Sequence, residues 1–264
     1  MRNIIILVFF TFLFTSCKKN KSIQQIPVIN SINFTHNVDR NNLVLGPDTS
    51  CCSEGSILPY TNADGQKYNV QRLRYLISNI NLHTDNETYK IKDIHYIDFD
   101  SISTHTIEVR GIESLNYTGI SFTMGLDNDL NLTNVSLFGG NQAYENESWH
   151  EKMIWPKNPV NSQPGGYHYM KLEGDLDTLG VVGYATHTGP TFGTDYSFYK
   201  YFDLAIRSTA RQTSFSININ MNINNWYTNP NNFTLNSNGV MEDSTKQKYL
   251  MENGEADVFS IFID

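Results

Sequence analysis

Hydrophobic and polar residues alternate along much of the chain, as they do in a strand with one face in a core and the other in water. The clearest run is FSININMNINNW (215–226), in which apolar residues alternate with Ser and Asn. The residues expected to face the core are Phe215, Ile217, Ile219, Met221 and Ile223. The intervening Asn residues are expected to face solvent or loops.

The same alternation recurs in YNVQRLRYLISNINLHT, YKIKDIHYIDF, YTGISFTMGLD, HYMKLEGDL and ADVFSIFID. Gly, Pro, Asn and Asp separate these runs at a spacing typical of a sandwich. We therefore expect an all-β fold, an antiparallel β-sandwich with long Asn-rich loops and at most one or two short helices. The strongest helix candidate is MEDSTKQKYLMENG (241–254), with Asp243 near its start and Gly254 as its stop.

Residues 1–16 are predicted to be a signal peptide. Their apolar run, NIIILVFFTFLFTS, is too short for a comfortable membrane span but suits a secretory signal. It ends at Cys17, and Phe14-Thr15-Ser16-Cys17 resembles a bacterial lipobox, in which the signal is cut before a cysteine that receives lipid. The alternative is a secreted protein with an incidental cysteine at this position.

The residues after the lipobox indicate a tethered domain. Residues 17–33 are basic and then polar without a period, so we interpret them as the lipidated cysteine and a tether, followed by one β-sandwich domain over 34–264. Lys18 stands where known sorting rules would place an acidic residue to keep a lipoprotein at the inner membrane. We therefore expect an outer-membrane lipoprotein, facing the periplasm or the cell surface, that touches the bilayer through lipid only.

Charge and cysteine usage narrow the function. The net charge is −8 with Lys and Arg scattered, so the sequence offers no basic face for nucleic acid. The remaining thiols, Cys51 and Cys52, are neighbours outside the reducing cytosol. They leave three alternatives open: a strained disulfide between them, free thiols, or thiols bound to metal.

Familiar enzyme motifs are incomplete. HEKMI (150–154) has Ile154 where a zinc protease has its second His, and DNDLNL (127–132) has Leu132 where a calcium loop needs Gly. No nucleophile elbow or phosphate-binding Gly-rich loop is present. We expect a binding protein and not an enzyme.

Several segments together resemble the MbnP-like family, secreted β-sandwich proteins named for a methanobactin-associated copper-binding member. These segments are INFTH (32–36), LRYLISNINL (73–82), GISFTMGLD (119–127), MIW (153–155) with GGYHYMKLEG (165–174), and YATHTG (184–189). The blocks at 73–82 and 165–174 are the most specific of them. The resemblance covers most of the chain after the tether.

The resemblance implies extracytoplasmic copper binding through His side chains, in some members helped by an oxidised Trp. Carried over by position, His36 and His187 are expected to converge as ligands, with Met153 and Trp155 from the M-x-W segment. Thioether and imidazole together suit Cu(I), because soft sulfur favours the reduced ion. Met153 and Trp155 are also natural core anchors.

Further histidines complete the candidate set. His168 is a metal candidate, although it alternates with Tyr167 and Tyr169 and would face solvent if the tyrosines face inward. His150 could reach a site from its polar loop. Glu173 and Arg74, in the two most specific blocks, suit a partly buried ion pair better than catalysis.

Two functions remain open at this point. The first is a lipoprotein that binds copper, either to store it or to deliver it to an outer-membrane importer. The second is a glycan- or protein-binding sandwich without metal, in which Tyr, Trp and Asn contact the partner and the histidines are incidental.

Overall fold

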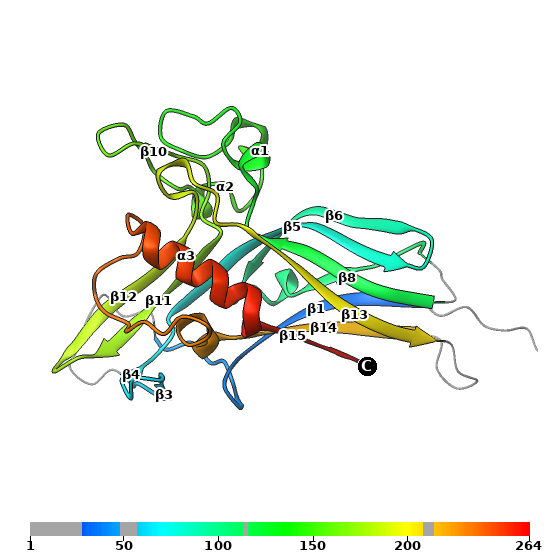
Figure 1. The fold of residues 1–264 in the computed structure, drawn as a ribbon, viewed down its shortest axis with the longest axis horizontal. Helices are drawn as coiled ribbons and strands as arrows, with labels where there is room; N and C mark the ends of the chain where they lie inside the picture. The colour runs from blue at the N-terminus through cyan, green and yellow to red at the C-terminus, as the bar shows by residue number, and fades with distance from the viewer. Residues whose placement is uncertain (1–27, 48–56, 113–115, 208–213) are drawn as a thin grey trace, which may run out of the picture.

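The computed structural model describes residues 28–47, 57–112, 116–207 and 214–264. Within these ranges the fold is all-β, with two large sheets around one main core, as the alternating pattern predicted (Figure 1). The signal peptide, Cys17, Cys51 and Cys52 lie outside the described residues. No helix in the described part of the chain is long and apolar enough to cross a membrane.

The smaller sheet has five strands. In spatial order they are β15 (Phe259–Ile263), β14 (Ser214–Asn222), β1 (Val28–Val38) and β2 (Asn41–Asn42), and β7 (Thr106–Glu108) also pairs with β1. β1 and β14 run parallel, whereas the other strand pairs of the described residues are antiparallel, as predicted. A parallel pair needs a long crossover connection, and most of the domain provides it here. The period of two predicts a strand but not its direction.

β1 begins at Val28, so the first strand includes residues 28–33, which the sequence assigned to the tether. Ile29 and Ile32 are both fully buried although they are three positions apart. An irregularity in the pairing between Ile29 and Ser31 accounts for this spacing. A bulge shifts every later side chain by one position, and it therefore concealed the strand from a search for alternation.

Polar side chains of β1 and β14 bond to each other along the parallel pair. The Ser31 and Ser216 hydroxyls lie 3.0 Å apart, and Asn33 Nδ2 donates to Asn218 Oδ1 at 3.1 Å. Asn218 also donates to Asp264 and is buried, whereas the sequence placed the Asn residues of this strand in solvent or loops. The Asn positions thus form a ladder on the polar face of the sheet.

The larger sheet has eight strands. In spatial order they are β13 (Phe198–Arg207), β8 (Asn116–Met124), β5 (Arg72–Thr84), β11 (Met170–Asp177), β4 (Lys67–Tyr68) and β3 (Tyr60–Thr61), with β12 (Val181–Thr188) beside β11 and β6 (Thr88–Asp98) beside β5. All these pairs are antiparallel. β6 follows one side of β5, and β11 and β8 share the other.

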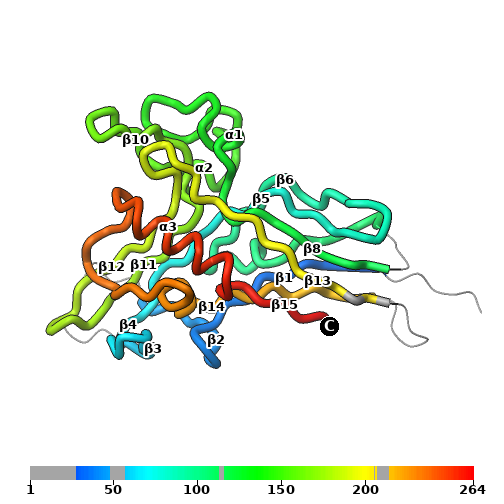
Figure 2. Tube along the Cα trace, in the orientation of Figure 1, coloured from blue at the N-terminus to red at the C-terminus, as the bar shows by residue number. Residues whose placement is uncertain are grey.

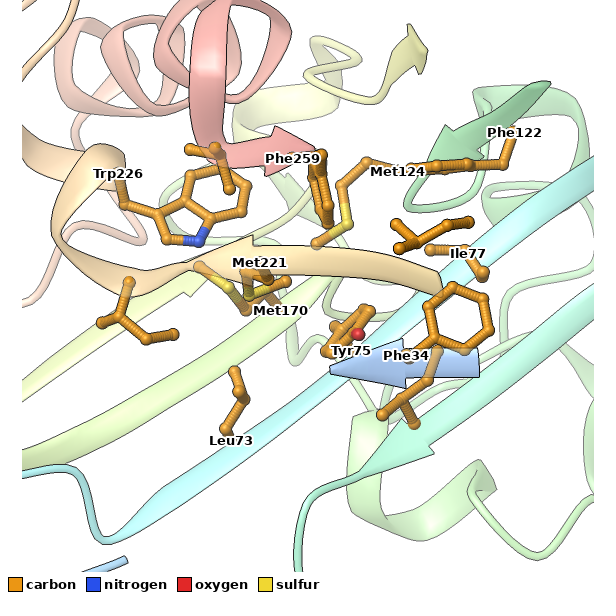
Figure 3. Close-up of a cluster of buried hydrophobic side chains, with 14 of the residues drawn as sticks. Phe34, Leu73, Tyr75, Ile77, Phe122, Met124, Met170, Met221, Trp226 and Phe259 are labelled. Atoms are coloured by element: carbon orange, nitrogen blue, oxygen red, sulfur yellow. The ribbon is translucent and has the colours of Figure 1, made fainter. Parts of the chain in front are cut away.

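The apolar faces of the two sheets form the main core. The predicted core face of β14 is confirmed, because Phe215, Ile217, Ile219 and Met221 are all buried. Figure 3 shows Met221 of the smaller sheet in one buried cluster with Met170 and Tyr75 of the larger sheet. β14 ends at Asn222, and the last residues of the predicted strand form a 3-10 helix, η4 (Ile223–Tyr227), which buries Ile223 and Trp226.

A long insertion leaves the larger sheet after β8 and returns at β11. The backbone of Leu76 in β5 is bonded to both ends of the insertion. Its carbonyl accepts from Gly125 N, and its N–H donates to Tyr169 O. The insertion lies at the top of the view in Figures 1 and 2, above β5 and β11. Its elements are α1 (Asn128–Asn131), η2 (Gln142–Tyr144), α2 (His150–Met153), β9 (Lys157–Asn158) and β10 (Gln163–Pro164).

The insertion packs on a second buried cluster, which we call the outer cluster. Its members are Leu76, Tyr96, Leu126, Trp149, Met153, Tyr167 and Tyr169. Leu76 faces the opposite way from its neighbours Tyr75 and Ile77, which are in the main core. The outer cluster therefore covers the face of the larger sheet that points away from the smaller sheet.

The predicted helix near the C-terminus is confirmed as α3 (Ser244–Asn253), and the Asp243 side chain caps it by accepting from Lys246 N. The α-helix ends at Asn253 with Gly254 as its C-cap, as predicted. Gly254 keeps helical angles (φ −60°, ψ −44°), and the chain continues as a π-helix, η5 (Gly254–Val258), into β15. The described residues also contain η1 (Ile102–Thr104) and η3 (Thr191–Gly193), and their three α-helices are one more than expected.

Gly254 is required by packing and not by its backbone angles. A Cβ there would lie 2.2 Å from Phe198 Cζ and 3.0 Å from Trp226 Cζ3. Gly254→Ala should lower the free energy of unfolding by about 1–3 kcal/mol through overpacking. Helix propensity alone would raise it by about 1 kcal/mol. Urea denaturation of the variant tests this packing. A lower free energy of unfolding than in the wild type supports the close contacts, and a higher one contradicts them.

Candidate metal centre

His168 lies in the segment that leads into β11. Its N–H donates to Met153 O at 2.7 Å, and Tyr169 N–H donates to Thr188 O at 2.7 Å, so the backbone is held between α2 and the end of β12. The side chain of His168 is only 4% exposed, not turned to solvent as strand alternation suggested. The segment is not a regular strand at this point, and Tyr167, His168 and Tyr169 are all buried.

The His168 ring is packed between two other rings. Its centroid lies 4.8 Å from that of Trp155 and 4.8 Å from that of His187. His168 Nδ1 is buried and has no hydrogen-bond partner. Burial, then the charges of His187 and Lys171, lowers the pKa of His168 well below its usual value. His168 is therefore neutral at physiological pH, and its buried Nδ1 has no hydrogen-bond partner.

His187 extends from β12 and bonds to Glu173 of the adjacent β11. Its Nε2 lies 2.7 Å from Glu173 Oε1. Burial would raise the pKa of Glu173, but the hydrogen bond to His187 and the charges of His187, Arg72 and Lys171 outweigh it and lower the pKa to about 2. Glu173 pairs with Arg72 and not with Arg74, whose partner is Asp98 at 3.0 Å.

Trp155 forms the other wall beside His168. It is fully buried, and its Nε1–H donates to Gln163 Oε1 at 3.3 Å. Its ring lies so close to Gly189 that a Cβ there would come within 2.3 Å of Trp155 Cε3. A surface cleft of about 380 Å³, lined also by Met241 and Glu242, adjoins Trp155.

Met153 occupies the outer cluster and is fully buried. Its bond to His168 runs through its backbone carbonyl. This position agrees with the interpretation of Met153 as a core anchor. A role of Met153 as a metal ligand stays a prediction.

His36 lies in a different place. Its Nε2 is 2.9 Å from the Tyr75 hydroxyl, and its ring centroid is 5.5 Å from that of His105. Tyr75 points into the main core, so its neighbour Arg74 is on the outer face of the larger sheet. Arg74 is opposite Lys171 of β11, and Lys171 is opposite His187 of β12. His187 is therefore on the outer face as well. His36 and His187 are therefore on opposite faces of the larger sheet. The expectation that they converge was wrong, because position in the sequence did not tell which face each side chain takes.

The other histidines have structural partners. His150 Nδ1 lies 2.7 Å from the Tyr167 hydroxyl, which in turn donates to Asn141 O, so His150 holds the insertion together. His83 bonds to Ser121, and His95 bonds to Thr104 O. These contacts fit the structural interpretation of the histidines in strands.

Among the described residues, no group of three or more His, Cys, Asp or Glu side chains is arranged to hold a metal ion. The structure does bring together His168 and His187, with Trp155 against the first and Glu173 bonded to the second. Imidazole binds copper in either oxidation state. This pair supplies two nitrogen donors at a largely buried position.

Comparison with known proteins agrees with this architecture. The family model MbnP matches residues 27–244. Among solved structures, MbnP from Methylosinus trichosporium is similar with a TM-score of 0.53 and 11% sequence identity, over 89% of this chain and 98% of that chain. At this identity the structural likeness concerns the fold alone. No curated protein matches the chain.

Proposed function

The chain belongs to the MbnP family, which is associated with methanobactin and copper, and from this premise we propose that it binds copper through His168 and His187. The observation that carries the proposal is the buried, unpartnered Nδ1 of His168. Buried polar atoms nearly always have a partner, and one left without costs about 1–3 kcal/mol. A bound ion would supply the missing partner.

The surroundings of the pair suit a metal ligand. A histidine must be neutral to bind metal, and burial keeps His168 neutral. The indole of Trp155 closes one side of His168 and keeps water from it. His36 is not part of the proposed site.

We further propose that binding takes place outside the cytoplasm and without catalysis. The lipobox resemblance at Cys17 supports a lipoprotein of the outer membrane, anchored by lipid and facing the periplasm or the cell surface. Such a protein would store copper or deliver it to an outer-membrane importer. The scattered positive charges support the expectation that it does not bind nucleic acid.

One observation favours the alternative, a glycan-binding role. A cleft of about 670 Å³ lies between β6 and the insertion, and Tyr96, Tyr144 and Trp149 line it together with Asn79 and Lys92. Aromatic walls with polar groups at the rim suit a sugar. The copper site is preferred because the cleft lacks an unsatisfied buried group among the described residues that line it.

Copper titration of purified protein tests the proposal. We expect His168→Ala and His187→Ala each to weaken copper binding by at least about 100-fold, since replacing a residue that only supports a ligand costs 10–100-fold. His36→Ala is the matched control, because it removes another buried histidine away from the site. Unchanged binding by both site variants would refute the site. Absence of binding by the wild type would favour the cleft.

A further inference from the structure

The contact between Glu173 and His187 determines which ring nitrogen of His187 is available to bind a metal. Their separation, 2.7 Å between Oε1 and Nε2, is that of a strong hydrogen bond. An ionised carboxylate only accepts, so the proton of this bond belongs to Nε2. In the neutral ring the other nitrogen, Nδ1, then carries no proton and is able to bind a metal.

Glu173 is itself held in place by its neighbours. Its Oε2 forms an ion pair with Arg72, and Lys171 Nζ lies 3.9 Å from its Oε1. Arg72 is directly opposite Glu173 on β5, and Lys171 is directly opposite His187 on β12. Three adjacent strands of the larger sheet therefore fix the carboxylate, and side chains on strands are positioned more accurately than side chains on loops.

We propose that Glu173 is a positioning residue of the copper site, which orients the His187 ring and keeps the proton on Nε2 so that Nδ1 is presented to copper. The proposal rests on the proposed function for its role in copper binding. A metal-binding histidine generally donates the N–H of its other ring nitrogen to a carboxylate, a carbonyl or water. What is new for this chain is the identity of that partner and of the ligating nitrogen.

The first test needs no metal. In ¹⁵N-labelled, metal-free protein at pH 8, imidazole spectra should show the proton of His187 on Nε2, with slow exchange against solvent. In Glu173→Ala this proton should exchange at least tenfold faster, and in Glu173→Gln, whose amide oxygen still accepts, the rate should be intermediate. A wild-type proton on Nδ1, or equal exchange in all three proteins, would overturn the proposal.

The second test measures copper affinity. Glu173→Ala should weaken binding 10–100-fold, the usual effect of losing an outer carboxylate, and Glu173→Gln should recover part of the loss. Glu108→Gln is the charge-matched control, because Glu108 is exposed, lies on the smaller sheet and pairs with Arg110. Equal affinities for the wild type and both Glu173 variants would overturn the positioning role.

The two tests separate the possible failures. If the wild type binds no copper but the exchange result holds, the proposed function fails while the assignment of the His187 proton stands. If the wild type binds copper through His168 and His187 and the Glu173 variants bind equally well, the function stands and the positioning role fails. Should Glu173→Ala not fold, Glu173→Gln alone gives both readouts, because it keeps an acceptor at the same place.

Discussion

Acidification from pH 7 to pH 4 should lower the free energy of unfolding by roughly 6 kcal/mol through His36 and His95 alone. Burial, helped by the charge of His105, lowers the pKa of His36 to about 3. Burial and then the charge of Lys92 lower the pKa of His95 to about 4, against a hydrogen bond to Thr104 that raises it. Domains are typically stable by about 5–15 kcal/mol, so unfolding near pH 4 is expected.

The free energy of unfolding decreases with falling pH because the unfolded chain binds more protons than the folded protein. In the unfolded chain these histidines take up a proton near pH 6.5, whereas in the folded protein they stay neutral down to about pH 3 or 4. The unfolded state therefore binds more protons within this window. The contribution of the two neutral histidines to stability is fully present above about pH 6.5. Below that pH the free energy of unfolding decreases by about 1.4 kcal/mol per histidine for each pH unit.

Urea denaturation at several pH values between 7.5 and 4.5 measures this slope. His36→Asn should make the slope shallower by about 1.4 kcal/mol per pH unit, whatever its stability at neutral pH. Ile217→Val, a core change without a titratable group, should lower stability by about 1 kcal/mol at every pH and keep the wild-type slope. A slope for His36→Asn equal to that of the wild type would show that His36 takes up its proton similarly in both states.

The sequence predicted the strands well where a strand separates one core from water. β14 alternates because its apolar face meets the larger sheet, and its predicted core residues are buried, as is Ile223 just beyond its end. The start of β1 was missed because the irregularity beside Ile29 breaks the period. The direction of β1 relative to β14 was missed for another reason, since pairing direction depends on the path of the chain between them and not on side-chain pattern.

The candidate site could be predicted only in part. The resemblance pointed to His187 and Trp155, and His168 was a separate metal candidate. The structure places these three side by side. The resemblance also pointed to His36, which the structure places on the other face of the larger sheet beside Tyr75. The orientation of His168 could not be inferred by alternation, because a bond from its backbone to Met153 sets the local path.

The packing roles of Gly254 and Gly189 could not be predicted from the sequence pattern. Gly254 was interpreted as a helix stop, the commonest role of a glycine at that point. The α-helix does end there, and the structure adds a close approach by Phe198, which is distant in the sequence. Gly189, two residues after His187, is of the same kind and meets Trp155. Close approaches between distant segments become visible only once the fold is known.

Gly189→Ala should therefore lower both stability and copper affinity. Its Cβ would lie 2.3 Å from Trp155 Cε3 and 2.5 Å from Cζ3, and a buried indole cannot bend away. We expect the free energy of unfolding to decrease by about 3 kcal/mol, at the upper end of overpacking costs. Because the Trp155 ring packs on His168, and Gly189 N–H donates to Gln247, which also bonds to His187 O, the displacement reaches both histidines.

The copper dissociation constant of Gly189→Ala should rise at least tenfold, measured by titration at a temperature where the variant is folded. Gly239→Ala is the matched control, because Gly239 lines the cleft beside Trp155 but a Cβ there meets no atom within 4 Å. It should keep the copper affinity of the wild type. If Gly189→Ala loses stability and yet binds copper as tightly as Gly239→Ala does, the packing of Trp155 supports the fold only. A joint loss of stability and affinity would instead mean that the contact of Trp155 with Gly189 determines where His168 and His187 lie.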